Sequence, residues 1–537
     1  MLVIREFYCR AIEKDNGKIL GAGIICLASL ILLLAVAARA IEKSGSYEND
    51  NCLTICLPSD VDSMDPVNHR SRITQIVLKN IFDSLTARDT CNRVVPQLAE
   101  EWRTLSNTEW EFRLRKGVRF HNGDELRASD VVFTLDRIVN ESYPGFPPSP
   151  RKGLFSPVSE VTAVDDYTIR IKTKNPWPGL PLMLSLQEII PEKYMKRVGP
   201  EKFNEMPVGT GPFRFVHREE NKEIVLERFE EYYGGSPERP PVQAAPLKNL
   251  VFKIVPSYLD QITLLKKKKC NLLFNIPPEF IPVLEMAGDI NILNLPATRC
   301  IFADINCARP FFKDPRAREA LNYAVDVETI VSQKLKGQAR ALSTIFLPKA
   351  EGFDPDLKPY HYNPEIARRL LKASNFPFEH VIDICTNQND LIFADSISVY
   401  LTKLGLKTRV RIIPGDRPGA AGADATWDIF TGSWGNSTLD PTGIVVPKLH
   451  SSGSANFSGF SSAELDNLLD EAQNTMTGTL RVRHFKRIQE ILFKEAPMIF
   501  GYAPDEYYAV TGNVKNFVPS TTGMLEMHDI ILEETKR

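Results

Sequence analysis

The chain has 537 residues, of which 43% are hydrophobic and 25% are charged, and its formal net charge is −2. This composition is typical of a globular protein and excludes a disordered chain. The length predicts two or three lobes rather than one core. A net charge so close to zero gives no electrostatic basis for binding nucleic acid, so no nucleic-acid partner is expected.

The N-terminal segment has the pattern of an export signal. Residues 19–38 contain no charged side chain, and basic residues precede them. This order is typical of a secretory signal peptide, and Ala38-Arg39-Ala40 fits a cleavage site. The apolar run is also long enough to span a bilayer, so residues 1–40 are either a signal peptide or an N-terminal membrane anchor. In both cases the body of the protein is expected in a periplasmic or extracytoplasmic location.

The first half of the chain alternates strand and helix patterns. Trp110, Phe112 and Leu114 alternate with charged residues, which predicts a strand with one apolar face. Asn122-Gly123 predicts a tight turn, and Ser129 stands at the N-cap position before an apolar helix. The other elements predicted here are a helix over 72–85 and strands over 52–57, 168–172, 224–226 and 250–255.

The second half is richer in helix signals. Asp314 and Pro315 suit the N-cap and the first position of a helix. Ser461 and Glu464 have the spacing of a capping box. The predicted elements are a helix from Asp314, a β-α-β unit over 381–413, and helices over 461–472 and 482–493. The whole pattern predicts an α/β protein.

Catalytic and metal-binding motifs are not found in the sequence. The 8 histidines have no His, Cys or carboxylate partner at a recognised metal-ligand spacing, and no Gly-x-Ser-x-Gly elbow occurs. Gly209-Thr210-Gly211 is followed by Pro212 where a phosphate-binding loop needs a helix N-terminus. We therefore predict no catalytic residues, no metal and no cofactor. The pairing of the cysteines stays open.

Three motifs in order resemble one protein family. The first lies between Gln97 and Asp136 and reads Trp-x-Phe-x-Leu-Arg-x-Gly-Val-x-Phe-x-x-Gly, followed by Ala-x-Asp-Val-x-Phe. PVGTGPFRF begins at Pro207, and INCARPFFKDPRAREALNYAVD runs from Ile305 to Asp326. These motifs resemble the family 5 extracellular solute-binding proteins, which include the oligopeptide- and dipeptide-binding proteins of bacterial ABC importers.

The resemblance implies a fold that the pattern alone does not give. It is the periplasmic binding protein-like α/β fold, with two mixed lobes joined by a hinge and an extra domain on the first lobe. Lobe I is expected over 41–88, 206–300 and 498–537, the extra domain over 89–205, and lobe II, which closes on the ligand, over 301–497.

The segment TGSWGNSTLDP, residues 431–441, is the candidate ligand site. A strand leads into a Gly-flanked Trp434, where backbone groups can pair with an extended ligand. The alternative is a core tryptophan beside a structural turn. The ligand-binding residues predicted in this segment are Ser433, Trp434, Gly435, Asn436 and Ser437.

The segment also departs from the family pattern. The resemblance implies an aspartate three residues after the tryptophan, which pairs with the ammonium of a peptide, but this chain has Ser437 there. Asp440 matches an acidic residue whose role in the family is structural. From the opposite lobe, His69 and Arg70 align with a ligand-facing segment.

The resemblance thus predicts a monomeric solute-binding protein of an ABC importer. It would capture peptides or peptide-like small solutes by hinge closure and deliver them to permease subunits in the inner membrane, with no bond made or broken. Two alternatives are an exported hydrolase or peptidase, and a membrane-tethered sensor or chaperone on the same fold.

Overall fold

A computed structural model describes residues 51–89, 92–235, 244–296, 298–413, 427–476, 478–520 and 522–533. The predicted signal peptide or anchor, residues 1–40, lies outside the described residues. The chain divides into Met1–Cys52 and Leu53–Arg537, and the architecture below is that of the second unit. Along the described part of the chain, no helix has the length and apolar character needed to cross a membrane.

A mixed central sheet runs through this unit, with β18 (Met498–Thr511) as its longest strand. On one side of β18 the order is β11-β1-β10-β9-β8, and on the other it is β13-β17-β15-β16. The first group has β1 at Cys52–Leu57, β8 at Phe213–Glu219, β9 at Glu223–Arg228, β10 at Asn249–Ile254 and β11 at Leu272–Leu273. The second has β13 at Arg299–Ile305, β15 at Val381–Thr386, β16 at Lys407–Ile412 and β17 at Ile429–Gly435.

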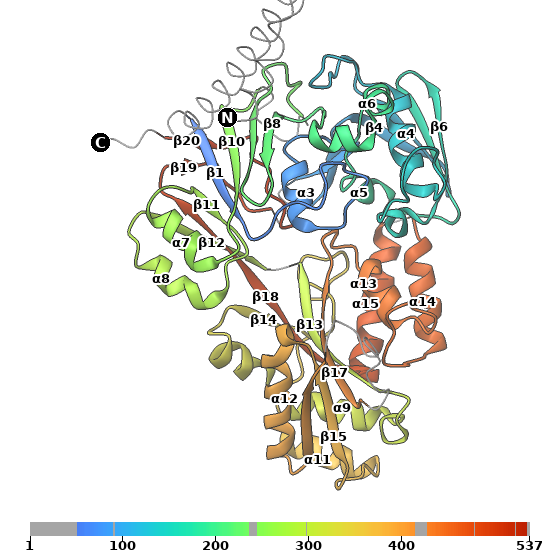
Figure 1. Cartoon of the computed structure of the whole chain (residues 1–537). Coiled ribbons are helices and arrows are strands. Elements are labelled where there is room, and N and C mark those ends of the chain that lie inside the picture. Colours follow the sequence, from blue (N-terminus) through green and yellow to red (C-terminus); the bar gives the residue numbers. More distant parts are fainter. Residues whose placement is uncertain are drawn as a thin grey trace, which may run out of the picture. The chain divides into compact units, whose positions relative to one another are not determined.

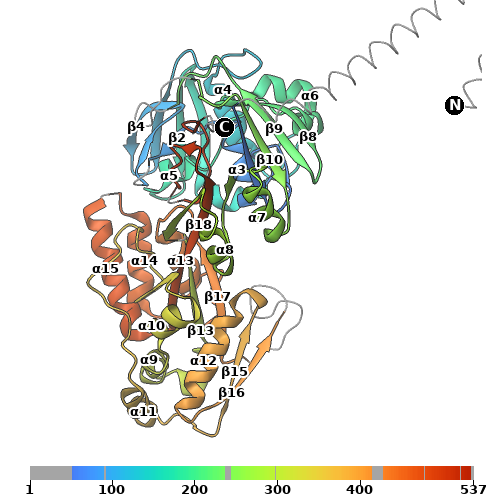
Figure 2. The ribbon, with the colours of Figure 1, turned by 90° about the vertical axis from the view of Figure 1, so that its left-hand side faces the viewer.

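The strand β18 belongs to both parts of the sheet. Its first residues pair with β13, as in Met498 opposite Asp304. Its last residues pair with β12 (Ile290–Pro296), as in Thr511 opposite Ile290. Between them, β18 pairs with β14 (Ala339–Ala341). Figures 1 and 2 both show β18 running from one part of the sheet into the other. The two parts are therefore joined by one continuous strand.

The second part of the sheet is covered by helices on both faces. Alternate residues of β13 belong to different apolar clusters: Ile301 and Ala303 pack with one set of helices, while Cys300 and Phe302 pack with another. This is the period of two expected of a strand buried on both sides. The first set is α9 (Pro315–Ala324), α11 (Pro364–Ala373) and α12 (Leu391–Lys403), and the second is α13 (Thr442–Leu449), α14 (Ala463–Asn474) and α15 (Gly478–Glu495).

The first family motif contributes β4 and β5 to a separate four-stranded sheet with the order β4-β5-β7-β6. Trp110, Phe112 and Leu114 are buried on one face of β5, as their alternation predicts. Gly123 has the positive φ expected for its turn. The strands are β4 at Ala99–Ser106, β5 at Glu109–Leu114, β6 at Val158–Asp165 and β7 at Thr168–Thr173, with α4 at Ala128–Val139.

The second family motif makes a close packing contact. A Cβ atom on Gly209 would lie 2.2 Å from the carbonyl oxygen of Ile81, and one on Gly211 would also overlap this backbone. The Gly211 amide donates to the Ile81 carbonyl. Only glycine allows this approach of two backbones. The motif is therefore a structural contact between two backbone segments and not a phosphate loop.

Three helix boundaries differ from the predictions. The helix predicted over 72–85 is α3 (Arg72–Leu78), since the Asn80 side chain donates to the Ile76 carbonyl and so replaces a further turn. The helix α4 begins before Ser129, because Asp130 accepts from the Arg127 amide. The N-cap of α14 is Ser462, not Ser461, since its side chain accepts from the Leu465 amide.

The remaining predicted elements are confirmed. Asp314 caps α9 through the Arg316 amide, and β15 and β16 are parallel neighbours joined by α12. The other elements are β2 (Thr86–Arg88), β3 (Val94–Pro96), α5 (Leu180–Leu184), α6 (Glu192–Glu205), α7 (Tyr258–Lys266), α8 (Ile281–Glu285), α10 (Val327–Thr329), β19 (Val514–Lys515) and β20 (Ile531–Leu532), with short turns of helix at Lys152–Phe155, Pro278–Phe280, Pro310–Phe312, Ile330–Lys334 and Gln388–Asp390.

Candidate ligand-binding site

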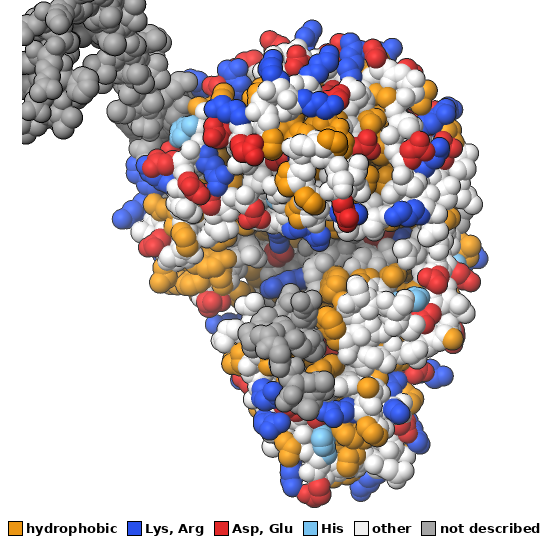
Figure 3. Space-filling view, turned by 45° about the vertical axis from the view of Figure 1, so that its right-hand side comes forward, with side chains coloured by type: hydrophobic (Ala, Val, Ile, Leu, Met, Phe, Trp, Pro, Cys, Tyr) orange, Lys and Arg blue, Asp and Glu red, His pale blue; other side chains and the backbone are white. Residues whose placement is uncertain are grey.

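A cavity of about 500 Å³ lies where the two parts of the sheet meet. Its walls come from segments far apart in the sequence: the start of α3, Arg151 and its surroundings, the start of β13, and the end of β17 with the turn that follows. The space-filling view shows a hollow in the surface with blue Lys or Arg side chains beside it (Figure 3). A cavity of this volume is large enough for a small organic solute.

One wall, which we call the α3 wall, consists of Arg70–Gln75 and Arg151. The Ser71 side chain accepts from the Thr74 amide and so begins α3. Arg72 makes a bidentate ion pair with Glu506 of β18, with N–O distances of 2.9 and 2.6 Å. Planar guanidinium–carboxylate pairing of this kind fixes both groups. The start of α3 is thus tied to the strand that joins the two parts of the sheet.

Behind this wall lies a buried polar network around Arg151, which is 3% exposed. Arg151 donates to the Gln75 side chain at 3.0 Å and to the Leu186 carbonyl at 2.5 Å. It also contacts Nε2 of His69 at 3.0 Å. Burial first, and then the charge of Arg151, lowers the pKa of His69 to about 3. His69 is therefore neutral at physiological pH and accepts a hydrogen bond from Arg151.

The opposite side, which we call the β17 turn, consists of residues 434–440. Trp434 lies in β17 opposite Cys300, and its indole nitrogen donates to the Gly443 carbonyl at 3.1 Å. The Asn436 amide donates to the Thr298 carbonyl at 2.6 Å, and the Asn436 side chain donates to the Asp440 carbonyl at 2.7 Å. These bonds hold the turn in one conformation.

Asp440 anchors this turn from behind. Both of its carboxylate oxygens accept from Arg481 at 2.9 Å, and one of them also accepts from the amide and hydroxyl of Thr442. Arg481 is shared with Glu351. Asp440 does not line the cavity. Its contacts thus agree with a structural role rather than with pairing to a ligand.

Arg88 of β2 contacts the backbone of the β17 turn. It donates to the Ser437 carbonyl at 2.7 Å and to the Thr438 carbonyl at 3.2 Å. The Asn92 side chain reaches the same Thr438 carbonyl at 3.4 Å. Burial lowers the pKa of Arg88 to about 10, so its guanidinium is still charged at neutral pH. The β17 turn is therefore in contact with β2, which pairs with β3 in a two-stranded sheet of its own.

Comparison with known proteins decides the family. The family model for bacterial extracellular solute-binding proteins, family 5, matches residues 93–456. The chain belongs to this family. It is 26% identical over 470 residues to the dipeptide-binding protein of Escherichia coli, covering 82% of this chain and 86% of that protein. It is 28% identical to heme-binding protein A of Haemophilus influenzae, covering 80% of this chain and 82% of that protein.

Solved structures of other proteins have the same fold as this chain. HbpA2 from Haemophilus parasuis has a TM-score of 0.82 at 21% identity and covers 90% of this chain and 100% of its own. DppA from Helicobacter pylori in complex with peptide STSA has a TM-score of 0.73 at 23% identity, with 90% and 98% covered. The predicted family and the α/β, periplasmic binding protein-like fold are confirmed. Members of the family are solute-binding proteins of extracellular location.

Only some of the predicted ligand residues line the cavity. Arg70, Trp434, Gly435, Asn436 and Ser437 line it. Ser433 and His69 do not line it. Ser433 precedes Trp434 in a strand and so points to the other face, and His69 is buried behind Arg151.

Sequence reasoning missed three arginines of the cavity: Arg72, Arg151 and Arg299. Arg72 is two residues from Arg70, so extending the predicted ligand-facing segment by two residues would have included it. Arg151 follows a Pro-rich loop, and Arg299 begins β13. Only the fold brings these two beside the cavity, and no local motif marks them.

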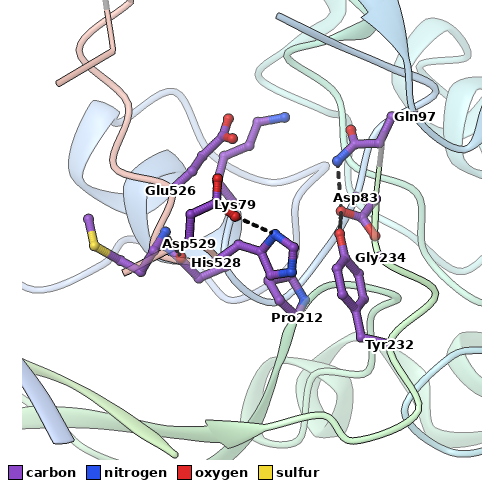
Figure 4. A pocket seen from close by; sticks show the side chains of 12 residues that line it. Lys79, Asp83, Gln97, Pro212, Tyr232, Gly234, Glu526, His528 and Asp529 are labelled. Carbon is purple, nitrogen blue, oxygen red and sulfur yellow. Dashed lines mark hydrogen bonds and ion pairs between the residues drawn. The ribbon is translucent and has the colours of Figure 1, made fainter. Parts of the chain in front are cut away.

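A second cavity, of about 330 Å³, shares Leu186, Thr522 and Met524 with the first. Nearby, a small pocket of about 40 Å³ is lined by Asp83, whose carboxylate accepts from Gln97 at 2.7 Å and from Tyr232 at 3.3 Å (Figure 4). Burial raises the pKa of Asp83 to about 6. The small pocket is closed by its own hydrogen bonds and has little room for a ligand. Within the described ranges no three His, Cys, Asp or Glu residues are grouped as a metal site.

Proposed function

We propose that this protein captures peptides or peptide-like small solutes in the 500 Å³ cavity and delivers them to the permease subunits of an ABC importer. The observation that carries the proposal is the two-sided lining of the cavity, by the α3 wall and by the β17 turn. The names of relatives support the solute class, since they include a dipeptide-binding protein and a probable di/tripeptide-binding protein.

The mechanism follows from this two-sided lining. A ligand can contact both sides only when they lie close together, so it binds the closed arrangement more tightly and increases its population. Arg88 contributes to the same arrangement through its bonds to the β17 turn. The continuous strand β18 supplies a connection about which the two parts can move. The closed protein is then the form that a permease recognises.

The end of β17 suits an extended ligand. In the described residues β15 pairs with β17 only at Ile429 and Phe430, so the edge of β17 toward Gly435 has no partner strand from β15. A peptide laid along such an edge gains main-chain hydrogen bonds without side-chain selectivity.

The proposal also includes a monomeric state, an extracytoplasmic location and the predicted domain limits. These limits are 41–88, 206–300 and 498–537 for lobe I, 89–205 for the extra domain and 301–497 for lobe II.

Two measurements on the full chain test the proposal. Native mass spectrometry of protein purified from bacterial envelopes without denaturation is expected to show a bound solute of peptide size. Small-angle scattering is expected to show a smaller radius of gyration with that solute than after its removal. A saturating, verified ligand that leaves the radius of gyration unchanged would contradict closure, and cargo of another chemical class would contradict the peptide assignment.

A further inference from the structure

We infer that the cavity selects peptide-like solutes through their carboxylate groups, with no requirement for a free ammonium. This inference rests on the proposed function and concerns the same cavity. It follows from three features: the excess of guanidinium groups lining the cavity, the lack of a carboxylate available at the β17 turn, and a buried arginine with incomplete partners.

More positive than negative side chains line the cavity. Its charged residues are Arg70, Arg72, Arg151, Arg299 and Glu506. The one carboxylate in this set, on Glu506, is taken up by the bidentate pair with Arg72. The other guanidinium groups have no carboxylate in the lining to neutralise them. The cavity therefore presents a positive potential to its contents.

Two of these guanidinium groups are accessible and largely unengaged. The Arg70 side chain donates to the Pro150 carbonyl at 3.2 Å, and it makes no other hydrogen bond among the described residues. The Arg299 side chain is exposed and makes no hydrogen bond or ion pair within the described ranges, and its charge partly offsets the rise that burial causes in the pKa of Asp390. Arg299 is the register partner of Gly435, two residues from Ser437. Both arginines are thus placed to donate to a ligand without breaking an existing ion pair.

Arg151 is the buried member of this set. Its terminal nitrogens bond to neutral groups, and its Nε has no partner among the described residues. Glu188, the acidic group nearest to it, is bonded to Gln75 and lies 3.4 Å from Lys79. A buried cation is costly unless an anion compensates it. A ligand carboxylate in the cavity supplies that compensation.

A free ammonium finds no equivalent partner. Ser437, which lines the cavity, carries a neutral hydroxyl. The neighbouring Asp440 is held by Arg481 outside the lining. An ammonium in this turn would lie near Arg299 instead of a carboxylate. The expected ligand is therefore a small peptide-like solute with two or more carboxylates, whose amino group is blocked or absent.

Three probes of equal backbone length separate the charges. Acetyl-Glu-Ala has two carboxylates and no ammonium, Glu-Ala has both kinds of group, and Gln-Ala-amide has only the ammonium. Titration calorimetry with the full chain should give acetyl-Glu-Ala at least the affinity of Glu-Ala. Gln-Ala-amide should bind about tenfold or more weakly, which is the range for losing a hydrogen bond to a charged group.

Single substitutions test whether the preference for carboxylates depends on arginines of the cavity. Arg299→Gln and Arg70→Gln should each weaken acetyl-Glu-Ala about tenfold and should not weaken Gln-Ala-amide. The control is Arg214→Gln, since Arg214 pairs with Glu227 on β8 and β9 and lies outside the cavity lining. It should leave all three affinities unchanged. Arg70 and Arg299 are exposed, so their replacement is expected to leave the fold intact.

The outcomes separate this inference from the proposed function. Tighter binding of Gln-Ala-amide than of acetyl-Glu-Ala would overturn the charge preference and leave peptide capture standing. Equal loss in Arg214→Gln and Arg299→Gln would also overturn it, since the effect would then be one of net charge. Failure of all three probes, together with a non-peptide cargo in native mass spectrometry, would overturn both.

Discussion

The α3 wall and the β17 turn face the same cavity but are built differently. The α3 wall presents charged side chains, and these are supported by a buried polar network of Arg151, His69 and Gln75. The β17 turn presents neutral side chains and backbone, and its one ion pair, Asp440 with Arg481, lies behind it. The difference indicates that the β17 turn itself supplies shape, while charge selectivity comes from the α3 wall and from Arg299 of the neighbouring strand β13.

The largest expected effect comes from removing the anchor of the β17 turn. Asp440→Ala leaves Arg481, which is 6% exposed, with only Glu351 as an ionic partner. Removing one partner of a buried ion pair costs about 3–5 kcal/mol. Because Arg481 keeps its other partner, we expect a loss of about 3 kcal/mol, the lower end of this range. Chemical denaturation measures this loss.

Asp314→Ala is the matched control for that change. Asp314 pairs with the exposed Arg316 and caps α9, so its removal should cost about 1 kcal/mol. If Asp440→Ala destabilises the protein no more than Asp314→Ala does, the β17 turn is not held by its ion pair. The proposed difference in how the two sides of the cavity are held would then be wrong.

A smaller effect is expected on the α3 wall and depends on pH. The pKa of His69 is about 3 in the folded protein, against about 6.5 in the unfolded chain. Between these values the unfolded chain binds the extra proton, so the stability due to neutral His69 is complete above pH 6.5 and is lost as the pH falls toward 3. At pH 5 the loss from this residue is about 2 kcal/mol.

His69→Gln tests this assignment, because glutamine can accept from Arg151 but does not titrate. Denaturation at pH 7 and pH 5 should show a fall in stability that is about 2 kcal/mol smaller in the variant than in the natural protein. Other buried groups, such as His121 with a pKa of about 4, are the same in both proteins and cancel in the difference. An equal fall in both proteins would mean that His69 is not held neutral.

Much of the fold could be predicted, because its signals are local. Alternation at Trp110, the cap at Asp314 and the turn at Gly123 each act within a few residues, and each is present in the structure. The predicted helix boundaries were wrong by a few residues because neighbouring polar side chains compete to begin or to end a helix. At α3, Asn80 bonds to both Ile76 and Leu525, and a single sequence gives no signal of the second contact.

The candidate site was less predictable for the same reason. Trp434 and its neighbours form a local motif, so the β17 turn could be predicted. The α3 wall depends on Arg151 and Glu506, which the fold brings to Arg70–Gln75 from distant segments. His69 was chosen from its neighbours in sequence, but its burial behind Arg151 is a property of the tertiary structure.

Placing a charge on the β17 turn would make it resemble the family pattern and so sharpen the comparison. Ser437→Asp adds a carboxylate to the cavity lining, and we expect about tenfold tighter binding of peptides with a free N-terminus. Acetylated peptides should not gain. Ser437→Asn, which has the same shape without the charge, is the control. A gain with Ser437→Asn, or none with Ser437→Asp, would show that the turn does not face the ligand amino group.

The smallest effect is expected at Arg88, which holds the β17 turn from β2. Arg88→Gln weakens the bonds to the Ser437 and Thr438 carbonyls without touching a group that lines the 500 Å³ cavity from α3. Neutral hydrogen bonds replace charge-assisted ones, so the closed population should fall and ligand affinity should drop about threefold to tenfold. The calorimetric loss should be accompanied by a larger radius of gyration in the ligand-free protein. If affinity falls while the radius of gyration stays the same, Arg88 acts on the conformation of the turn and not on closure. This result would place selectivity and closure on separate groups of the same interface.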